Sequence, residues 1–271
     1  MLSNCHARIN GCGKAPIVAN CMHMNAVYVM WLREMKRFIR SRSRIVGALG
    51  QPLLFLIAFG YGFGPVFAKA GQGNYLEFIA PGIIGMSIIF TAIFNGMQVI
   101  WDRQFGFLKE TMVAPVSRLS IMFGRTLGGA TVASIEGMLV LIIAVIVGFR
   151  PSSWAGIVPA ILVMLLIALL FSALGIMAAS RLKDMQGFQI IMNFLVIPLF
   201  FLSGALFPLN TVPSALLFVA RLDPLSYGVD ALRYFLIGVA TFPIALDIGV
   251  LVGITALFLA VGSYFFSRME V

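Results

Sequence analysis

Six apolar runs in this sequence are each about as long as a bilayer is thick. A helix needs about 20 consecutive apolar residues to cross a hydrocarbon core of about 30 Å. Because hydrocarbon offers no water to the backbone, only helices and closed barrels span it. Hydrophobic residues make up 61% of the 271 residues and charged residues only 11%, which a soluble domain does not show. We predict an all-α integral membrane protein with six spanning helices, at 46–67, 77–100, 119–148, 156–179, 187–206 and 246–266.

A seventh apolar region, residues 212–242, is interrupted by prolines and charges. Pro213, Arg221, Asp223 and Pro224 fall within its first half, and charges at the bilayer centre are costly. The region therefore does not suit a continuous span. We predict short helices that are re-entrant or interfacial, on the extracytoplasmic side between spans five and six.

The distribution of Lys and Arg predicts the orientation of the chain, because cytoplasmic loops carry an excess of both. With the N-terminus inside, 15 of the 19 Lys and Arg residues face the cytoplasm and four face the other side. We therefore expect a multi-pass protein of the cytoplasmic (inner) membrane with both termini cytoplasmic. The net charge of +9 then indicates contact with anionic membrane lipids, and no nucleic acid is expected as a partner.

Residues 1–24 fit none of these patterns. They hold Cys5, Cys12 and Cys21 with His6 and His23, but the spacing matches no zinc-binding pattern. The segment also lacks the apolar core of a signal peptide. We expect a poorly ordered tail, or a chain that starts at one of the methionines near its end, and no metal site.

Residues 25–44 predict an amphipathic helix at the cytoplasmic membrane interface. Apolar side chains recur at helical spacing on one face and basic side chains occupy the other, which is typical of helices that lie between lipid headgroups. The alternative is a helix packed against another protein. The membrane-interface residues are predicted to be Trp31, Arg33, Lys36, Arg37, Phe38 and Arg40.

No motif for catalysis or nucleotide binding is complete. The fragment "GCGK" at 11–14 resembles the end of a phosphate-binding loop but has Arg8 and Ala15 at two required positions. The motifs of zinc hydrolases and of serine esterases are absent. "GYGFG" at 60–64 lacks the rest of a potassium filter. We therefore predict a chain that is not an enzyme by itself and that carries no catalytic residue, cofactor or metal.

An ion-coupled secondary transporter is the alternative function. Such proteins use ionisable groups within the membrane and show internal repeats. Here the two halves show no obvious similarity, and Glu136 is the ionisable residue expected deepest in a span. Its carboxyl group could instead hydrogen-bond a neighbouring helix or reach a polar cleft. The nearby Gly124, Gly128 and Gly129 have the spacing that lets helices approach closely.

Four stretches carry a family resemblance. They are "FIAPGIIGMSIIF" (78–90), "FGFLKETMVAPVSRLSIMFGRTLGG" (105–129), "FLSGALFPL" (201–209) and "LDPLSYGVDALRY" (222–234). In this order they resemble the signature regions of ABC-2 type transporter permeases, closest to the daunorubicin-resistance and nodulation-export branch of ABC exporters. The resemblance covers about residues 25–271 and implies a half-transporter with an N-terminal interface helix (25–44) and a six-span transmembrane domain (45–271).

The resemblance also implies a partner subunit that hydrolyses ATP. In the family the cytoplasmic loop between spans two and three forms a coupling helix that docks on a separate ABC ATPase, which holds the ATP and Mg²⁺. Here that helix is expected over 103–112, ended by Pro115, which cannot continue it. The alternative is a solvated amphipathic turn on the membrane surface. Implied coupling residues are Arg103, Phe105, Phe107, Leu108, Lys109, Glu110 and Arg118.

Finally, the resemblance implies a transport route between two permeases, either a homodimer or a pair with a paralogue. The route would be lined by spans one, two and five, whose aromatic surface with a few polar groups suits an amphiphilic substrate such as a drug, a lipid or a lipid-linked glycan. Multidrug and polysaccharide export are both compatible with it. The candidate pathway residues are Phe55, Phe59, Phe90, Phe94, Asn95, Asn193, Phe194 and Phe200.

Overall fold

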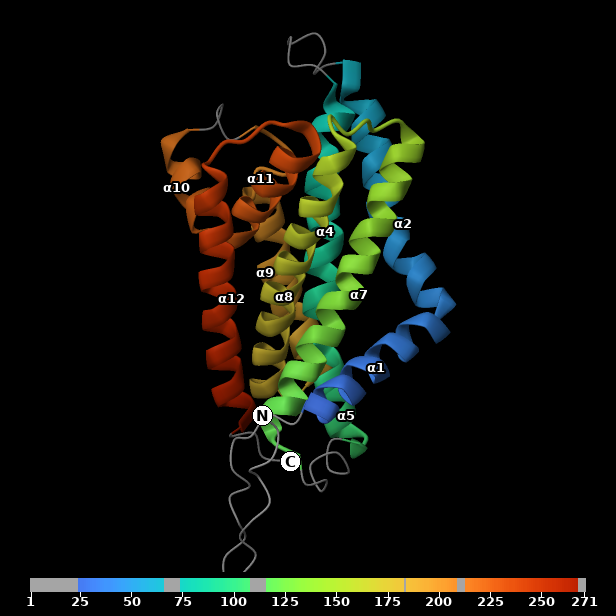
Figure 1. Ribbon diagram of the computed structural model, residues 1–271, viewed down its shortest axis with the longest axis vertical. Helices are drawn as coiled ribbons and strands as arrows, with labels where there is room; N and C mark the ends of the chain where they lie inside the picture. Colours follow the sequence, from blue (N-terminus) through green and yellow to red (C-terminus); the bar gives the residue numbers. More distant parts are fainter. Residues whose placement is uncertain (1–23, 66–73, 108–115, 183, 209–212, 268–271) are drawn as a thin grey trace, which may run out of the picture.

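The computed structural model describes residues 24–65, 74–107, 116–182, 184–208 and 213–267, and the elements in these ranges are all helical. The predicted tail before Met24 lies outside the described residues. The helices are α1 (Met24–Arg40), α2 (Arg42–Gly62), α4 (Tyr75–Asn95), α5 (Met97–Gln104), α7 (Arg118–Val147), η1 (Trp154–Gly156), α8 (Ile157–Arg181), α9 (Met185–Leu202), α10 (Ser214–Leu222), α11 (Pro224–Ile237) and α12 (Ile244–Ser267) (Figure 1).

The six predicted spans are confirmed within the described residues. Each corresponds to a helical segment long and apolar enough to cross a bilayer, and the second joins α4 to α5. The interrupted region forms α10 and α11 instead. At about 1.5 Å per residue, the 14 residues of α11 are too short to span. The spanning segments are Ile45–Gly62, Tyr75–Gln104, Arg118–Val147, Trp154–Arg181, Met185–Leu202 and Ile244–Ser267.

The helices begin where short polar side chains can cap them. Asn74, Ser117, Asp184 and Asp223 each accept a hydrogen bond from a backbone N–H in the first turn of α4, α7, α9 and α11, respectively. Such caps satisfy amides that the helix itself leaves unpaired. They fix the helix starts to within a few residues of the positions that the apolar pattern predicts.

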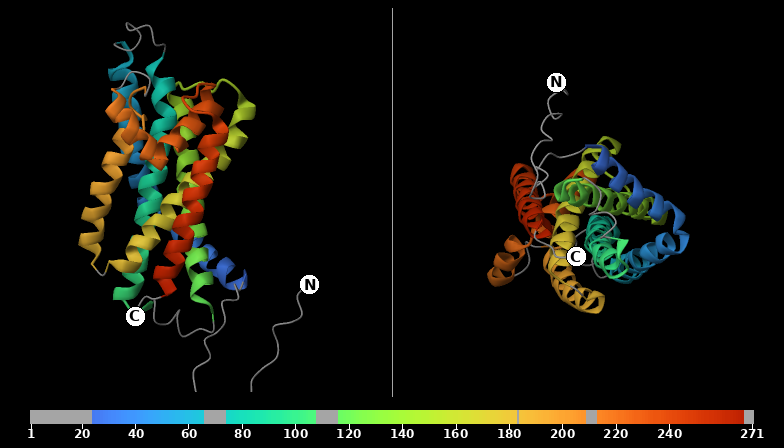
Figure 2. Two further views of the ribbon diagram at one scale, coloured as in Figure 1. Left: turned by 90° about the vertical axis from the view of Figure 1, so that its left-hand side faces the viewer. Right: turned by 90° about the horizontal axis from the view of Figure 1, so that it is seen from below.

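The two ends of the bundle are formed by different helices. At one end lie α1, α5 and the C-terminal end of α12, and at the other lie α10, α11 and the start of α4 (Figure 1). We call these the α1 end and the α11 end. Figure 2 shows that α1 lies across the bundle, whereas the spanning helices run along it.

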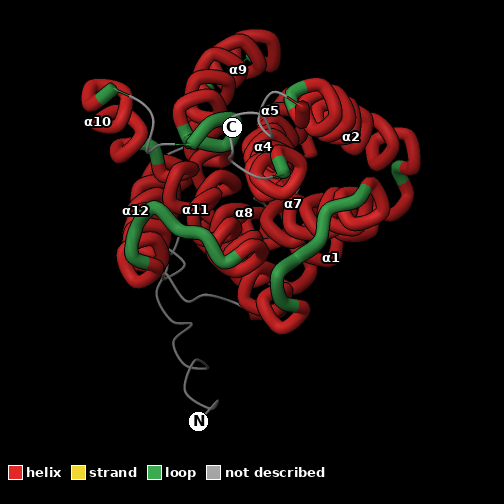
Figure 3. The backbone as a smooth tube through the Cα atoms, turned by 90° about the horizontal axis from the view of Figure 1, so that it is seen from above, coloured by secondary structure: helices red, strands yellow, loops and turns green. Residues whose placement is uncertain are grey.

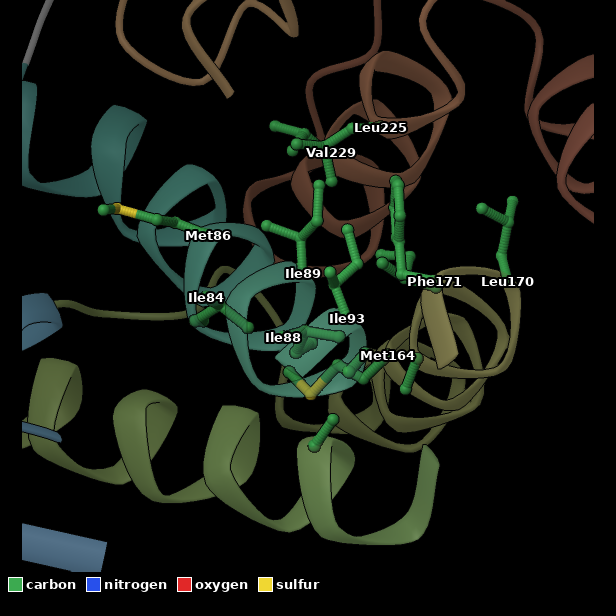
Figure 4. Close-up of a cluster of buried hydrophobic side chains, with 14 of the residues drawn as sticks. Ile84, Met86, Ile88, Ile89, Ile93, Met164, Leu170, Phe171, Leu225 and Val229 are labelled. Carbon is green, nitrogen blue, oxygen red and sulfur yellow. The ribbon is translucent and has the colours of Figure 1, made fainter. Parts of the chain in front are cut away.

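Helix α4 is the central element of the bundle. It packs against α2, α7, α8, α9 and α11, and Ile79, Ile83, Ile88, Ile89 and Ile93 are all 0% exposed. In Figure 4, Ile89 and Ile93 point toward Phe171 of α8 and Val229 of α11. These contacts bury all sides of α4 except the strip that faces between α2 and α9.

Glycines bring α4 and α8 into backbone contact. Gly96 joins α4 to α5, and a Cβ atom built there would lie 2.3 Å from the carbonyl oxygen of Gly175 in α8. A Cβ on Gly175 would lie 2.5 Å from the carbonyl oxygen of Ile93. Small residues allow such close approach. The resulting van der Waals packing is a main source of helix association in lipid, where the hydrophobic effect does not drive helices together.

A buried arginine holds α11 against α4. The Arg233 guanidinium is 4.0 Å from the Phe78 ring centroid and donates a hydrogen bond of 3.2 Å to the carbonyl oxygen of Gly204. Burial lowers the pKa of Arg233 to about 10, so the group remains a cation at neutral pH. The cation–π contact and the hydrogen bond together compensate for burying that charge.

Because the contact between Gly96 and Gly175 leaves no room for a methyl group, Gly96→Ala is expected to destabilise the bundle by about 1–3 kcal/mol. The measurement is thermal unfolding of the purified protein in detergent. Gly253→Ala in α12 is the matched control, because no atom of the described residues outside the backbone of α12 itself lies within 4 Å of its Cβ position. If both variants unfold at the wild-type temperature, backbone contact does not hold α4 to α8.

Candidate functional site

A groove runs between α2, α4 and α9. Figure 3 shows α2 and α9 on either side of α4, and α4 packs against both. Two cavities open along this strip of α4 and share Gln51, Met86 and Phe90 in their walls. We call the cavity of about 360 Å³ the aromatic cavity and the cavity of about 200 Å³ the polar cavity.

The aromatic cavity contains most of the predicted pathway residues. Phe55 and Phe59 of α2, Phe90 of α4, and Asn193 and Phe200 of α9 line it. Phe55 and Phe59 are stacked, with ring centroids 5.4 Å apart. The structure therefore places side chains from spans one, two and five around one cavity, and the transport route itself stays a prediction.

The polar cavity brings hydrogen-bonding groups into the membrane region. Gln51 of α2, Ser87 and Thr91 of α4, and Glu136 of α7 line it, together with Phe94. The Thr91 hydroxyl donates a hydrogen bond to Oε2 of Glu136. Both alternatives considered for Glu136 are therefore present, since its carboxyl bonds a neighbouring helix and lies at a polar cavity.

Two predicted pathway residues are placed elsewhere. Asn95 donates a hydrogen bond of 3.3 Å from Nδ2 to the carbonyl oxygen of Gly129 in α7, so it helps to join two helices. Phe194 lies in α9 but is 82% exposed and is not among the residues of either cavity wall. Helical periodicity explains the difference from Asn193, since residue 194 follows it directly and points about 100° away around the helix.

A cluster of charges joins α1, α5 and α7 at the α1 end. Asp102 of α5 accepts hydrogen bonds of 3.1 and 3.2 Å from Arg33 of α1 and forms an ion pair with Arg125 of α7. Asp102 is 3% exposed and Arg125 is 4% exposed. On α1 itself, Glu34 lies 3.5 Å from Arg37. The charges inside this end of the bundle thus stabilise one another, as buried ions must.

Several predicted membrane-interface residues of α1 also make contacts within the chain. Arg33 and Arg37 contact carboxylates of the same chain, and burial lowers the pKa of Arg37. Phe38 is 5% exposed, and Trp31 Nε1 donates to Thr131 of α7 at 3.1 Å. Phe38 was expected to meet lipid but is buried, because α7 presents a surface of small residues on which α1 packs. For Trp31, Arg33 and Arg37 the membrane-interface role stays a prediction.

Glycines of α7 make that packing possible. A Cβ atom at Gly124 would lie 2.7 Å from Met30, and one at Gly128 would lie 2.7 Å from Glu34. The close approach that the glycine spacing predicted is therefore confirmed, with α1 as the partner. Lys36 and Arg40 remain exposed on α1, so they are the residues of the predicted basic face that are free to contact lipid phosphate.

The predicted coupling residues have three different placements. Leu108, Lys109 and Glu110 lie outside the described residues. Arg103 donates hydrogen bonds to the carbonyl oxygens of Ala179 and Leu182 at the end of α8. Arg118 donates to the carbonyl oxygen of Ser267 at 2.7 Å. Both arginines thus bond other helices of the same chain.

The phenylalanines of this loop are accessible. Phe105 is 61% exposed and Phe107 is 54% exposed. Helix α5 ends at Gln104, and Gly106 has a φ of +80°, so a coupling helix does not begin at Arg103 as predicted. A positive φ strains residues other than glycine, so Gly106 allows the chain to turn directly after α5.

Sequence reasoning missed Asp102 and Arg125 as partners, and it also missed Gln51, Ser87 and Thr91. A signal for the first two was present, since an arginine within a spanning segment requires a counter-charge. For the residues of the polar cavity, the sequence contained no comparable signal. Ser and Thr are common in membrane helices, and their placement beside Glu136 depends on how α2, α4 and α7 pack.

The fold defines a multi-pass helical membrane protein with an aromatic cavity bordered by polar groups. Comparison with known proteins identifies the family of the chain. Residues 25–237 match the model of the ABC-2 type transporter family, and the chain belongs to this family.

Named relatives agree with that assignment. The chain is 27% identical to "Putative transport permease ycf38" of Cyanophora paradoxa over 82% of this chain and 77% of the relative. It is 26% identical to "Nodulation protein J" of Rhizobium leguminosarum bv. trifolii over 83% of each. It is 29% identical to "Inner membrane transport permease YadH" of Escherichia coli K12 over 84% of this chain and 89% of the relative. Two of these names describe transport permeases.

The charge cluster yields a stability prediction. Asp102→Asn leaves the Arg125 guanidinium buried without its counter-charge, which is expected to cost about 3–5 kcal/mol. Thermal unfolding in detergent measures the loss. Arg33→Gln is the control and is expected to cost less, because the Arg33 side chain is 36% exposed and water replaces the lost pair. Equal stability of Asp102→Asn and wild type would contradict a structural role for the cluster.

Proposed function

We propose that this chain is the transmembrane subunit of an ABC exporter that moves an amphiphilic substrate out across the cytoplasmic membrane. ATP hydrolysis on a separate ABC ATPase subunit would power the transport, with ATP and Mg²⁺ bound there and no cofactor on this chain. A drug, a lipid or a lipid-linked glycan fits the substrate class. The family assignment supports the permease role, and the groove supports the kind of substrate.

The aromatic cavity is the observation that carries this proposal. Its walls combine stacked phenylalanines with Gln51 and Asn193, and binding sites for amphiphiles are typically apolar with a few placed polar groups. The groove lies on the side of α4 where α2 and α9 leave large side chains exposed, including Leu54 at 67% and Phe194 at 82%. A second copy packed there would enclose the groove, and we propose a homodimer, with a paralogous partner as the other arrangement.

The proposed orientation follows from charge. Lys36, Arg40 and Arg42 are exposed at the α1 end, and positively charged residues favour the cytoplasmic side. The α1 end would then face the cytoplasm with both termini, and α10 and α11 would lie at the outer side. Phe105 and Phe107, exposed at the same end, would fill an apolar groove of the ATPase.

The energy source separates this proposal from an ion-coupled secondary transporter. In proteoliposomes that contain the chain and its ABC ATPase, export of a fluorescent amphiphile should require ATP and continue without ion gradients. The purified chain alone should not hydrolyse ATP, since no complete phosphate-binding loop occurs in the sequence. Transport by the chain alone under a proton or sodium gradient would overturn the proposal in favour of the secondary transporter.

Glu110 tests the proposed coupling to the ATPase. We propose that its carboxylate pairs with a basic group of the ATPase, so that Glu110→Lys replaces attraction with repulsion at a cost of about 2–5 kcal/mol. Export should fall at least about tenfold, and the ATPase should lose its response to substrate while the permease still inserts. Glu77→Lys, in the first turn of α4 at the α11 end, is the matched control. Wild-type export by Glu110→Lys would show that the loop does not transmit ATP hydrolysis.

A further inference from the structure

We propose that the junction of α1 and α2 is a binding site for an anionic membrane lipid whose headgroup carries two phosphate groups. The junction is hollowed by a cavity of about 930 Å³, which we call the basic cavity. Among the described residues, it shares no lining residue with the aromatic or the polar cavity. The inference therefore concerns a lipid bound outside the groove, and it does not rest on the proposed export function.

The walls of the basic cavity are rich in positive charge. None of the described residues that line it is Asp or Glu, and five are basic: Arg33, Lys36, Arg37 and Arg40 of α1 and Arg42 of α2. Phosphate groups bind well where several N–H donors converge, and the guanidinium of arginine matches two phosphate oxygens at once. The chemistry of the walls thus favours a ligand that carries phosphate.

Three of the five cations are not neutralised by the described part of the chain. Arg33 contacts Asp102 at 3.1 Å, and Arg37 lies 3.5 Å from Glu34. The other three side chains are exposed and form no ion pair with a carboxylate of the described residues: Lys36, Arg40 and Arg42. Like charges gathered at one cavity repel one another, so a bound anion would relieve the repulsion.

The positions of these three cations favour two phosphates over one. Lys36 and Arg40 are four residues apart, which is about 6 Å along a helix, and Arg42 lies beyond the break between α1 and α2 at Ser41. The basic cavity is also more than twice as large as the aromatic cavity of about 360 Å³. Two phosphates joined by a short linker carry two negative charges and can contact cations on both sides of the break, whereas a single phosphodiester supplies one charge. Basic pockets of membrane proteins bind lipid headgroups of this kind.

The first turn of α2 adds backbone donors to the same cavity. Ser41 precedes α2, and its side chain makes no capping hydrogen bond, whereas α4, α7, α9 and α11 are capped. Ser41 and Ser43 both line the basic cavity, so the start of the helix lies in its wall. The first N–H groups of a helix have no acceptor within the helix, and they attract anions. A phosphate oxygen would satisfy them in addition to its contacts with the basic side chains.

The surroundings of the basic cavity suit a lipid better than a soluble anion. Helix α1 lies across the bundle (Figure 2), and its junction with α2 projects from the side of the bundle away from α12 (Figure 1). The spanning segment of α2 begins at Ile45, so the cavity lies beside the end of a span, where lipid headgroups are found. Val29 and Leu32 also line the cavity, and Val29 is 60% exposed. These apolar side chains would contact the glycerol and the upper acyl chains, which a soluble phosphate lacks.

Lipid binding to the purified, delipidated full-length chain in detergent tests the inference. Native mass spectrometry gives the dissociation constant of the first bound lipid for cardiolipin, which has two phosphates, and for phosphatidylglycerol and phosphatidylcholine with the same acyl chains. We expect cardiolipin to bind at least about tenfold more tightly than phosphatidylglycerol and phosphatidylcholine to bind most weakly. Inorganic pyrophosphate at the same concentration should leave the affinity for cardiolipin within about twofold. A smaller preference for cardiolipin, or its displacement by pyrophosphate, would overturn the proposal.

Variants separate the basic cavity from general attraction to anionic lipid and from the additional acyl chains of cardiolipin. Arg40→Gln combined with Arg42→Gln should reduce the preference for cardiolipin over phosphatidylglycerol to less than about threefold. Because both side chains are exposed, the lipid-free variant should unfold at the wild-type temperature. The matched control, Arg150→Gln with Arg221→Gln, removes the same charge from exposed positions after α7 and in α10 and should keep the full preference. If the first variant keeps the preference, or the control loses it equally, cardiolipin binds elsewhere and the proposal fails.

Discussion

The packing of α4 against its five neighbours is the constraint on which the rest of the structure depends. In lipid, helices gain little from burying apolar surface against one another, so shape and close approach decide how they associate. At Gly96 and Gly175 the backbones of α4 and α8 meet with no side chain between them. This contact sets the direction of α5, and hence the position of Asp102. It also leaves one strip of α4 facing the space between α2 and α9.

The strip of α4 between α2 and α9 and the charge cluster lie in different parts of the molecule. Along the strip, phenylalanines from three spans surround the aromatic cavity, and Gln51, Ser87 and Thr91 line the adjoining polar cavity. At the α1 end, Asp102 connects three helices through Arg33 and Arg125. A movement of α5 would therefore act on α1 and α7 together, because both arginines depend on the same carboxylate. Since α5 continues α4, such a movement would also reach the groove.

Helix α1 shows how one amphipathic pattern serves two environments. Its Val27, Glu34 and Phe38 are buried, while Lys36 and Arg40 remain exposed. Periodicity predicts that one face differs from the other, but it does not state whether the apolar face meets lipid or protein. The glycines of α7 decide the matter here, since they create a surface that the side of α1 bearing Val27, Met30, Trp31 and Glu34 can approach closely.

The sequence by itself determined the six spans, the interrupted region that forms α10 and α11, and the family. These features depend on the length of apolar runs, on helix breakers and on motifs, which are all local properties. Only the tertiary structure decided that Arg33 pairs with Asp102, that Phe194 lies outside both cavity walls, and that Ser87 and Thr91 line one cavity with Glu136. Such contacts join residues far apart in the chain, and their formation depends on the rotation and distance of packed helices, which no local pattern specifies.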